Sequence, residues 1–267
     1  MAHTLKGRVL IIAGSDPSGG AGIQADIKAC TAMGAYAMTA ITALTAQDTN
    51  GVTGVHEVPE TFIAEQIKLC LDDIGADTIK TGMLHRASVI QAVFDATQGH
   101  GRGIPLVLDP VMVAKGGSPL LQKDAVHALQ TLLIPIAALI TPNIPEAELL
   151  SGMTIETDAD MKKAGQAILK RGAKAVLMKG GHREGAEVTD ILLTEGGAKT
   201  FRSPRIKTRQ THGTGCTLAS AIAASLAQGM ALETAVERAR NYVWNAINTA
   251  PGYGSGHGPL NHLADAD

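Results

Sequence analysis

Short apolar runs that alternate with segments of helical periodicity constrain the fold of this chain most strongly. Residues 8–13 begin with Arg8 and continue as an unbroken apolar run, which is typical of a strand buried on both faces of a parallel sheet. The next segment repeats apolar residues at Ile23, Ile27 and Cys30 and meets a helix stop at Gly34. Because this order recurs along the chain, it predicts an α/β fold with a mainly parallel sheet and helices on both faces.

Two segments are expected to form antiparallel pairs instead. Asn50-Gly51 separates the apolar stretch 37–46 from residues 52–58, and this dipeptide is a strong signal for a hairpin turn. Residues 190–194 and 200–202 resemble a second antiparallel pair. The other strands are expected within 77–83, 104–109, 137–140 and 175–179, and the other helices within 59–74, 86–97, 126–133, 161–168, 218–226 and from 145 onward.

Composition and charge exclude some functions rather than select one. The net charge is −2 and aromatic residues make up 3% of the chain, so nothing favours binding to nucleic acid or to an anionic membrane surface. The 45% hydrophobic content is that of an ordinary globular protein. Because the sequence contains no internal repeat, low-complexity tract or linker, we expect one domain over residues 1–267.

The cysteines favour a reducing compartment. Cys30, Cys70 and Cys216 are odd in number and widely spaced, which favours neither a disulfide framework nor a CxxC metal site. A cytoplasmic location is therefore expected, and no apolar signal segment follows the N-terminal residues. The apolar stretch 216–232 is interrupted by polar residues and falls short of a membrane span.

Residues 211–216, Thr-His-Gly-Thr-Gly-Cys, carry the strongest functional signal. A helix is expected directly after them, because Leu218, Ile222 and Leu226 recur every four residues. The two glycines then lie at a helix N-terminus, where unpaired N–H groups and the helix dipole favour an anion such as phosphate. Cys216 lies at the same place, where the pKa of a thiol tends to fall.

Neither glycine-rich segment matches a common nucleotide-binding fingerprint. Residues 211–216 lack the third glycine of G-x-G-x-x-G and the Lys-Ser/Thr end of a P-loop. Residues 14–22 lie between a strand and a helix, but their spacing does not match either motif. In open α/β sheets, ligands bind beyond the carboxyl ends of the strands. The residues expected there are Gly14, Gln47, Met83, Asp109, Asn143, Glu146 and Lys179.

These residue types suit phosphoryl transfer, which needs a cradle for the transferred group, cations and a positioned nucleophile. Residues 213–216 are a candidate cradle, Lys179 a candidate cation, and Asp109 with Glu146 a candidate Mg²⁺ site. Each residue also has an ordinary alternative. Asp109 precedes a proline and can form a turn, Glu146 can favour a helix start, Lys179 can be solvated, and Cys216 can be a small buried residue.

Seven blocks of sequence, in one order, resemble a known family. They are AGSDPSGGAGIQAD (13–26), ITALTAQ (41–47), KTGML (80–84), LDPVM (108–112), LITPNIPEA (139–147), LMKGGH (177–182) and THGTGCTL (211–218). On these blocks the chain resembles the bacterial hydroxymethylpyrimidine/phosphomethylpyrimidine kinases of thiamine biosynthesis, within the ribokinase-like superfamily. The resemblance extends from about residue 8 to residues 256–259.

The resemblance implies a three-layer ribokinase-like fold, with a central, mostly parallel sheet flanked by helices, usually as a homodimer. It implies two successive ATP-dependent phosphorylations, with Mg²⁺, of 4-amino-5-hydroxymethyl-2-methylpyrimidine and then of its monophosphate. A pyridoxal or pyridoxine kinase on the same scaffold is the alternative, but the blocks with Asp26 and Gln47 favour the pyrimidine. A non-catalytic vitamer sensor is a third hypothesis, against which the intact candidate catalytic residues weigh.

By the same resemblance, five residues form the substrate end of the site. Gln47 and the backbone at Val111 would recognise the aminopyrimidine edge, while Gly14, Asp26 and Met83 would line the pocket. Residues 111–119 would act as a flap over the site.

The resemblance assigns the phosphate end as well. Gly213, Gly215 and Cys216 would hold the transferring phosphoryl group, Lys179 would contact ATP phosphates, and Asn143 would lie in the nucleotide region. Asp109 and Glu146 would influence Mg²⁺ through water.

Cys216 stands where the wider superfamily carries an aspartate base. We hypothesise that its thiolate takes the hydroxyl proton in the first phosphorylation. The second phosphorylation starts from a phosphate that is already mostly ionised, so it should depend on Cys216 less. The loose transition state of phosphoryl transfer also asks little of a base.

Overall fold

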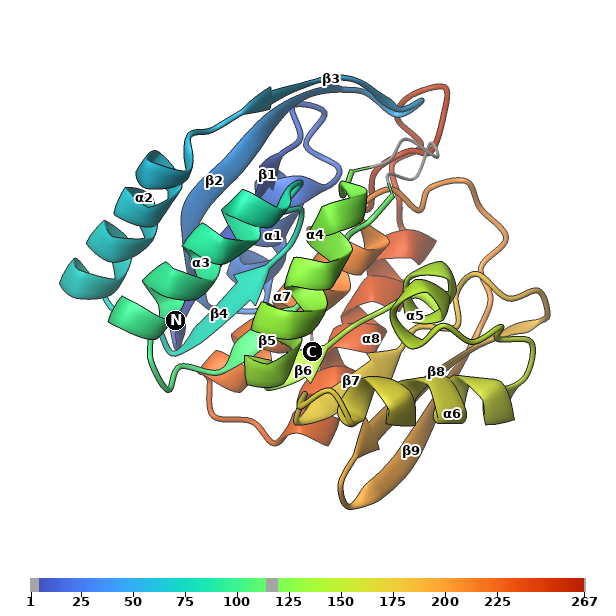
Figure 1. Cartoon of the computed structure of the whole chain (residues 1–267). Helices are drawn as coiled ribbons and strands as arrows, with labels where there is room; N and C mark the ends of the chain where they lie inside the picture. Colours follow the sequence, from blue (N-terminus) through green and yellow to red (C-terminus); the bar gives the residue numbers. More distant parts are fainter. Residues whose placement is uncertain (1–4, 114–119, 267) are drawn as a thin grey trace.

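One β-sheet organises the residues that the structure describes. The computed structural model describes residues 5–113 and 120–266. Within these ranges nine strands form one sheet in the order β3-β2-β1-β4-β5-β6-β7-β8-β9 (Figure 1). Neighbours from β2 to β7 are parallel, whereas β3, β8 and β9 pair antiparallel. The strands are β1 (Arg8–Ser15), β2 (Tyr36–Gln47), β3 (Val52–Glu57), β4 (Thr78–Thr81), β5 (Leu106–Leu108), β6 (Leu139–Ile140), β7 (Ala175–Met178), β8 (Glu187–Thr194) and β9 (Gly197–Pro204).

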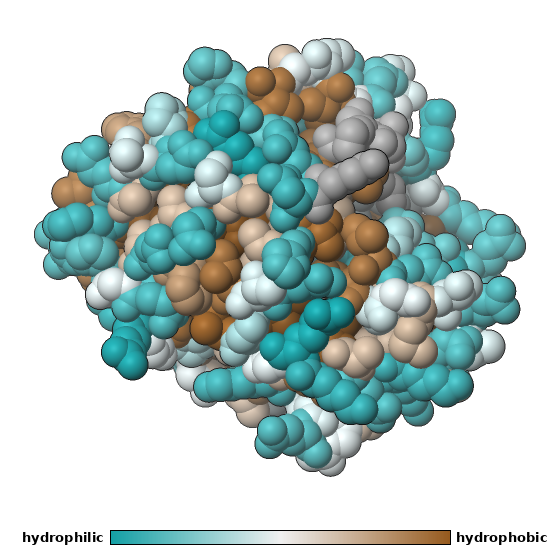
Figure 2. Space-filling view, viewed as in Figure 1, coloured by the Kyte–Doolittle hydropathy of each residue, from teal (hydrophilic) through white to brown (hydrophobic). Residues whose placement is uncertain are grey.

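Helices cover both faces of the sheet (Figure 1). Ile63 and Met161 belong to the apolar core on one face, and Ile23 and Leu218 to the core on the other. Figure 2 shows the outward-facing sides of the helices on the face that contains Ile63 and Met161, where hydrophilic residues surround smaller hydrophobic areas. The first face carries α2 (Glu60–Asp73), α3 (Ala87–His100), α4 (Lys123–Ala128), α5 (Ile144–Ser151) and α6 (Asp158–Leu169), and the second α1 (Gly22–Ala32), α7 (Thr214–Ala227) and α8 (Leu232–Asn248).

The predicted three-layer α/β architecture is confirmed. The hairpin predicted around Asn50-Gly51 is the β2–β3 pair, in which Leu44 lies opposite His56. The second predicted pair is β8–β9. The helix predicted over 126–133 is α4, which continues as a single wider π turn over Leu129–Leu133.

The buried face of α1 contains Ile23 and Cys30 as predicted, but not Ile27. Ile27 is 37% exposed, although the periodicity predicts it on the buried face of α1, and Asp26 is fully buried instead. The carboxylate is accommodated because Lys80 Nζ and Ser220 Oγ each donate a hydrogen bond of 2.7 Å to Asp26 Oδ1. A buried charge needs such partners, and they come from β4 and α7, which a local pattern does not reveal.

The parallel order brings the candidate site residues to one edge of the sheet. Asp109 directly follows β5, and Lys179 follows β7 and pairs with Asn143 in an isolated parallel bridge. The N-terminus of α7 lies at the same edge (Figure 1). In the part of the chain that the structure describes, no helix has the length and apolar character needed to cross a bilayer.

The C-terminal segment adds a pH-dependent contribution to stability. His262 is buried, its Nε2 lies 3.0 Å from Thr217 Oγ1, and its carbonyl oxygen accepts a hydrogen bond from the Tyr242 hydroxyl. Burial, with a smaller effect of the Lys28 charge, lowers the pKa of His262 to about 4. The unfolded chain takes up this proton near pH 6.5. The contribution of neutral, buried His262 to the free energy of unfolding is therefore complete above pH 6.5 and is lost as the pH falls towards 4.

We expect this histidine to remove up to about 3 kcal/mol from the free energy of unfolding between pH 7 and pH 4. Urea denaturation at several pH values measures the loss. His262→Gln, which cannot take up the proton, should flatten this part of the pH profile. The matched variant His56→Gln changes an exposed histidine on β3 and should keep the profile of the parent. An unchanged slope in His262→Gln would contradict the prediction.

Candidate active site

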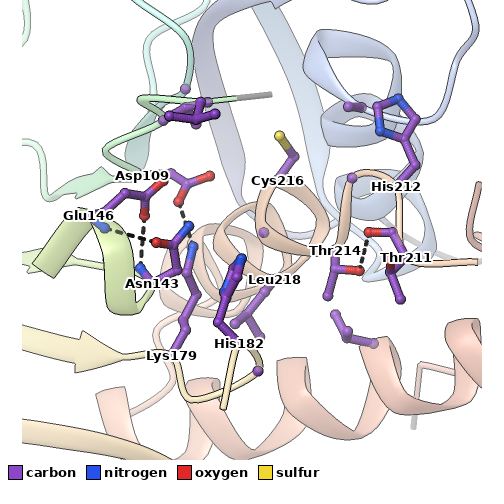
Figure 3. A pocket seen from close by; sticks show the side chains of 18 of the residues that line it. Asp109, Asn143, Glu146, Lys179, His182, Thr211, His212, Thr214, Cys216 and Leu218 are labelled. Carbon is purple, nitrogen blue, oxygen red and sulfur yellow. Dashed lines mark hydrogen bonds and ion pairs between the residues drawn. The ribbon is translucent and has the colours of Figure 1, made fainter. Parts of the chain in front are cut away.

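A cavity of about 690 Å³ opens at the carboxyl ends of the parallel strands. It collects residues from the loops after β1, β4, β5, β6 and β7, together with the first turn of α7. Sequence positions far apart thus share one site (Figure 3). The predicted site residues that line it are Gly14, Gln47, Met83, Asp109, Val111, Asn143, Glu146, Lys179, Gly213, Gly215 and Cys216.

Asp26 is the exception among the predicted site residues. The resemblance implies that it lines the substrate pocket, but the structure does not place it among the lining residues. Its side chain is fully buried against Lys80 and Ser220. The ion pair with Lys80 holds the carboxylate in the core beneath the cavity, and the predicted role of Asp26 in the substrate pocket stays a prediction.

The first turn of α7 forms the predicted anion cradle in an unexpected register. The helix begins at Thr214, so Gly215 and Cys216 lie within its first turn rather than ahead of it. Gly213 precedes the helix with a φ of 76°. A β-carbon at residue 213 would lie 1.8 Å from the Gly20 carbonyl oxygen, so both the backbone angle and the space require glycine. The first-turn N–H groups have no partner within the helix and are open to an anion.

Lys179 faces this turn and is held by a carboxylate (Figure 3). Its Nζ donates a hydrogen bond of 3.0 Å to Asp109 Oδ1, which also accepts one from Thr141 Oγ1. Burial alone would lower the pKa of Lys179, but the Asp109 and Glu146 carboxylates raise it further than burial lowers it. A β-carbon at Gly215 would lie 3.2 Å from Lys179 Nζ. The ammonium group therefore lies beside the helix N-terminus and is charged.

Asn143 and Glu146 form a capping box at the start of α5. Asn143 Oδ1 accepts from the Glu146 N–H at 3.0 Å, and Glu146 Oε2 accepts from the Asn143 N–H at 2.8 Å. The Asn-x-x-Glu spacing is a sequence signal for such a box, which the sequence analysis did not use. Burial raises the pKa of Glu146 to about 7, and the Asp109 carboxylate adds to this against the lowering effect of Lys179.

The carboxylates suit a divalent cation. Lys179 pairs with Asp109 and also favours the ionised form of Glu146, but burial, with a smaller effect of the Asp109 charge, raises the pKa of Glu146. A further positive charge beside them would favour both ionised carboxylates. Both carboxylates already accept hydrogen bonds from protein groups, so contact through water fits Mg²⁺ better than a closed protein cage. Within residues 5–113 and 120–266, no three His, Cys, Asp or Glu side chains gather as a metal site.

The pKa of Cys216 departs from the prediction. The helix N-terminus predicts a lowered pKa, but burial raises it to about 12. Lys80 lowers the pKa of this thiol, while Asp26 and Asp109 raise it. The prediction was wrong because burial of a thiol outweighs the helix dipole. The side chain is a neutral thiol in the ligand-free protein and points from α7 into the cavity (Figure 3).

A buried carboxylate–histidine pair at the substrate end was missed by the sequence analysis. His212 Nε2 lies 2.8 Å from Asp16 Oδ2 and 3.5 Å from Gln47 Nε2. Asp16 also accepts hydrogen bonds from the backbone N–H groups of Ser18 and Ala21. The pair therefore ties the loop after β1 to the residue before Gly213. The available signal was a polar, ionisable residue within each of the two glycine-rich stretches, Asp16 and His212.

The predicted flap, 111–119, is described only at its start. Val111, Met112 and Val113 line the cavity, and residues 114–119 lie outside the described residues. Leu120, directly after them, also lines the cavity, and its N–H donates a hydrogen bond of 2.8 Å to the Met112 carbonyl oxygen.

Comparison with known proteins decides the family. The family model for phosphomethylpyrimidine kinase matches residues 16–261. The chain belongs to this family. A hydroxymethylpyrimidine/phosphomethylpyrimidine kinase of Bacillus subtilis is 46% identical over 258 residues, which cover 96% of this chain and 95% of that protein. The thiamine biosynthesis bifunctional protein ThiED of Geobacter sulfurreducens is 48% identical over 98% of this chain, and the match covers 53% of that relative's length.

Solved structures agree with this placement in the phosphomethylpyrimidine kinase family. A phosphomethylpyrimidine kinase from Clostridium difficile is similar with a TM-score of 0.81 and 42% identity, over 91% of this chain and 100% of that one. Pyridoxal kinase from Bacillus subtilis, solved as an ADP complex, has a TM-score of 0.89 and 35% identity, over 97% and 98% of the chains. The predicted family, ribokinase-like fold and phosphotransferase activity are confirmed.

Gly213 and Gly229 allow a matched test of the contact that positions α7. Both have a left-handed backbone, with φ of 76° and 82°, but a β-carbon at Gly229 would meet no atom within 4 Å. We expect Gly229→Ala to lower the free energy of unfolding by about 1–2 kcal/mol, from backbone strain alone. Gly213→Ala should lower it by at least about 2 kcal/mol more, because its methyl group overlaps the Gly20 carbonyl. Equal losses in chemical denaturation would show that the contact at Gly20 is not tight.

Proposed function

We propose that this kinase transfers the γ-phosphoryl group of ATP to the hydroxymethyl group of 4-amino-5-hydroxymethyl-2-methylpyrimidine, and then a second one to the resulting monophosphate. The observation that carries the proposal is the first turn of α7, which faces Lys179 and Asp109 across one cavity. Such a site stabilises the charge of a transferring phosphoryl group. The names of relatives with nearly full coverage support the pyrimidine as substrate.

The phosphate end of the cavity provides most of the rate acceleration in this proposal. The N–H groups at Gly215 and Cys216 donate to the equatorial oxygens of the transferring group, and Lys179 stays charged beside them. Mg²⁺ bound with ATP supplies further positive charge, with Asp109 and Glu146 acting through water. Because phosphoryl transfer has a loose transition state, positioning and charge supply most of the rate acceleration.

The substrate end holds the ring. Gln47 offers an amide that both donates and accepts, as recognition of an aminopyrimidine edge requires, and Val111 lines the same cavity. Met83 and Gly14 provide an apolar wall for the ring face. A β-carbon at residue 14 would lie 3.1 Å from Met83 Sδ, so glycine leaves Met83 room beside the ring.

Pyridoxal kinase activity is the second candidate, favoured by a specific observation. The pyridoxal kinase fold covers 97% of this chain at a TM-score of 0.89. Sequence identity is higher to the pyrimidine kinases, at 46% and 42% against 35%. We therefore place the pyrimidine first.

We further propose that the protein acts in the cytoplasm as a homodimer. Cys30, Cys70 and Cys216 are all free thiols, which supports a reducing compartment. The side chains of Leu44 and Val55 on the edge hairpin β2–β3 are exposed. An apolar edge hairpin supports association with a second copy.

Product analysis tests the proposed reaction. The protein is incubated with ATP, Mg²⁺ and the pyrimidine alcohol, and products are separated by mass. We expect the monophosphate to appear first and the diphosphate to follow. Pyridoxal in parallel reactions should be turned over more slowly. Pyridoxal phosphate as the main product, or no phosphorylated pyrimidine, would contradict the proposal.

Cys216→Ala tests the proposed proton acceptor. The pKa of about 12 leaves little thiolate, so we expect a moderate loss of about 10- to 100-fold in kcat on the alcohol. The phosphorylation of the monophosphate should fall less than about threefold, because no hydroxyl proton leaves in that step. Near-normal turnover of the alcohol by Cys216→Ala would reject the role.

A further inference from the structure

A buried lysine beneath the site has no assigned role. Lys80 on β4 is fully buried, and its Nζ donates a hydrogen bond of 2.7 Å to Asp26 Oδ1. Ser220 Oγ donates to the same oxygen, and Asp26 Oδ2 has no partner. A buried ion pair of this kind is weak evidence for stability, since well-packed apolar residues often do as well or better.

The lysine side chain is directed towards the cavity floor. Gly82, two residues further along the same strand, lines the cavity, and a β-carbon on it would lie 3.2 Å from Lys80 Nζ. The ammonium group therefore lies just beneath Gly82, at the edge of the sheet where the site opens.

The ion pair also lies under the cysteine. Cys216 and Ser220 are four residues apart on α7, so their side chains lie on one face of the helix. Ser220 contacts Asp26 directly, which places the Lys80–Asp26 pair one helical turn below Cys216. The positions of Gly82 and of Ser220 thus locate the same ammonium group from two independent elements.

We propose that Lys80 is a positioning residue for the first phosphorylation and acts through Cys216 from beneath the cavity floor. The inference rests on the proposed function. When the substrate oxygen bonds to the γ-phosphorus, the bond from that phosphorus to the β–γ bridging oxygen breaks and ADP leaves. The hydroxyl proton passes to the Cys216 thiolate. This thiolate forms when the neutral Cys216 thiol first loses its own proton to water, and the Lys80 charge stabilises the thiolate until it accepts the hydroxyl proton.

The charges around Cys216 support this role. Four charged groups act on the thiol: Lys80 from β4, Asp26 from α1, Asp109 after β5, and Lys179 after β7. Lys80 lowers the pKa of the thiol by more than either carboxylate raises it. Lys179 is already engaged with Asp109 and faces the phosphates. Lys80 interacts most strongly with Asp26 and next with Cys216, and it is the cation with the largest lowering effect on the pKa of the thiol.

The experiment compares the two phosphorylations in variants that lack the buried charge. Lys80→Met alone leaves Asp26 unpaired, so the double variant Lys80→Met/Asp26→Asn is made as well, and Lys80→Arg keeps the charge. We expect the neutral variants to lose at least about tenfold in kcat on the alcohol, with the KM for ATP within about twofold. Turnover of the monophosphate should stay within about threefold, and Lys80→Arg should recover part of the first step.

A mutant cycle with Cys216→Ala separates this role from a structural one. If Lys80 acts through Cys216, adding Cys216→Ala to the neutral variants costs no further activity on the alcohol. Additive losses, or equal losses in both phosphorylations, would overturn the proposal. Wild-type protein that makes no phosphorylated pyrimidine would instead refute the proposed function, so the two failures are distinguishable.

A second measurement does not depend on turnover. Peptide mapping gives the rate at which iodoacetamide alkylates Cys216, since only the thiolate reacts. Removal of the Lys80 charge should slow this alkylation several-fold at a fixed pH, while alkylation of Cys70, which lies outside the cavity, should keep its rate. An unchanged rate at Cys216 in the folded variants would overturn the proposal.

Discussion

The close approach of α7 to the loop after β1 is the contact on which the site depends. At Gly213 the two backbones leave no room for a β-carbon, and the left-handed φ turns the chain straight into the helix. As a result, Gly215 and Cys216 lie in the first turn, and their N–H groups meet the ligand space rather than helix carbonyls. The His212–Asp16 pair also joins the loop after β1 to the residue before Gly213. The proposed anion binding rests on this backbone geometry before any side chain contributes.

Buried charged side chains surround the N-terminus of α7, and their positive and negative charges nearly cancel. The Asp109–Lys179 and Asp26–Lys80 pairs each keep a carboxylate and an ammonium group together inside the protein. Glu146 lies beside these pairs, and burial raises the pKa of its carboxyl group, so a further positive charge there would favour its ionised form. Charges placed in this way cost stability. In the proposed function this cost is offset when nucleotide phosphates and Mg²⁺ enter the site.

Much of this arrangement can be predicted from the sequence, because it follows from repeated local patterns. The apolar runs located the strands, parallel pairing placed their carboxyl ends together, and so Asp109, Asn143 and Lys179 were expected at one edge. Contacts between residues far apart in the sequence could not be predicted in this way. Asp26 and Lys80 lie 54 residues apart, and no local pattern reveals that each is the other's partner. The raised pKa of Cys216 has the same origin, since burial depends on what packs over the helix.

The central claim is that the first turn of α7 binds the transferring phosphoryl group. Backbone amide chemical shifts, measured by NMR before and after adding ADP, Mg²⁺, aluminium fluoride and the pyrimidine alcohol, test it most directly, because aluminium fluoride imitates the phosphoryl group in transfer. The account predicts that the amides of Gly215 and Cys216 shift among the most in the chain. If those amides stay in place while the protein binds the same mixture, the phosphoryl group lies elsewhere and the account is wrong.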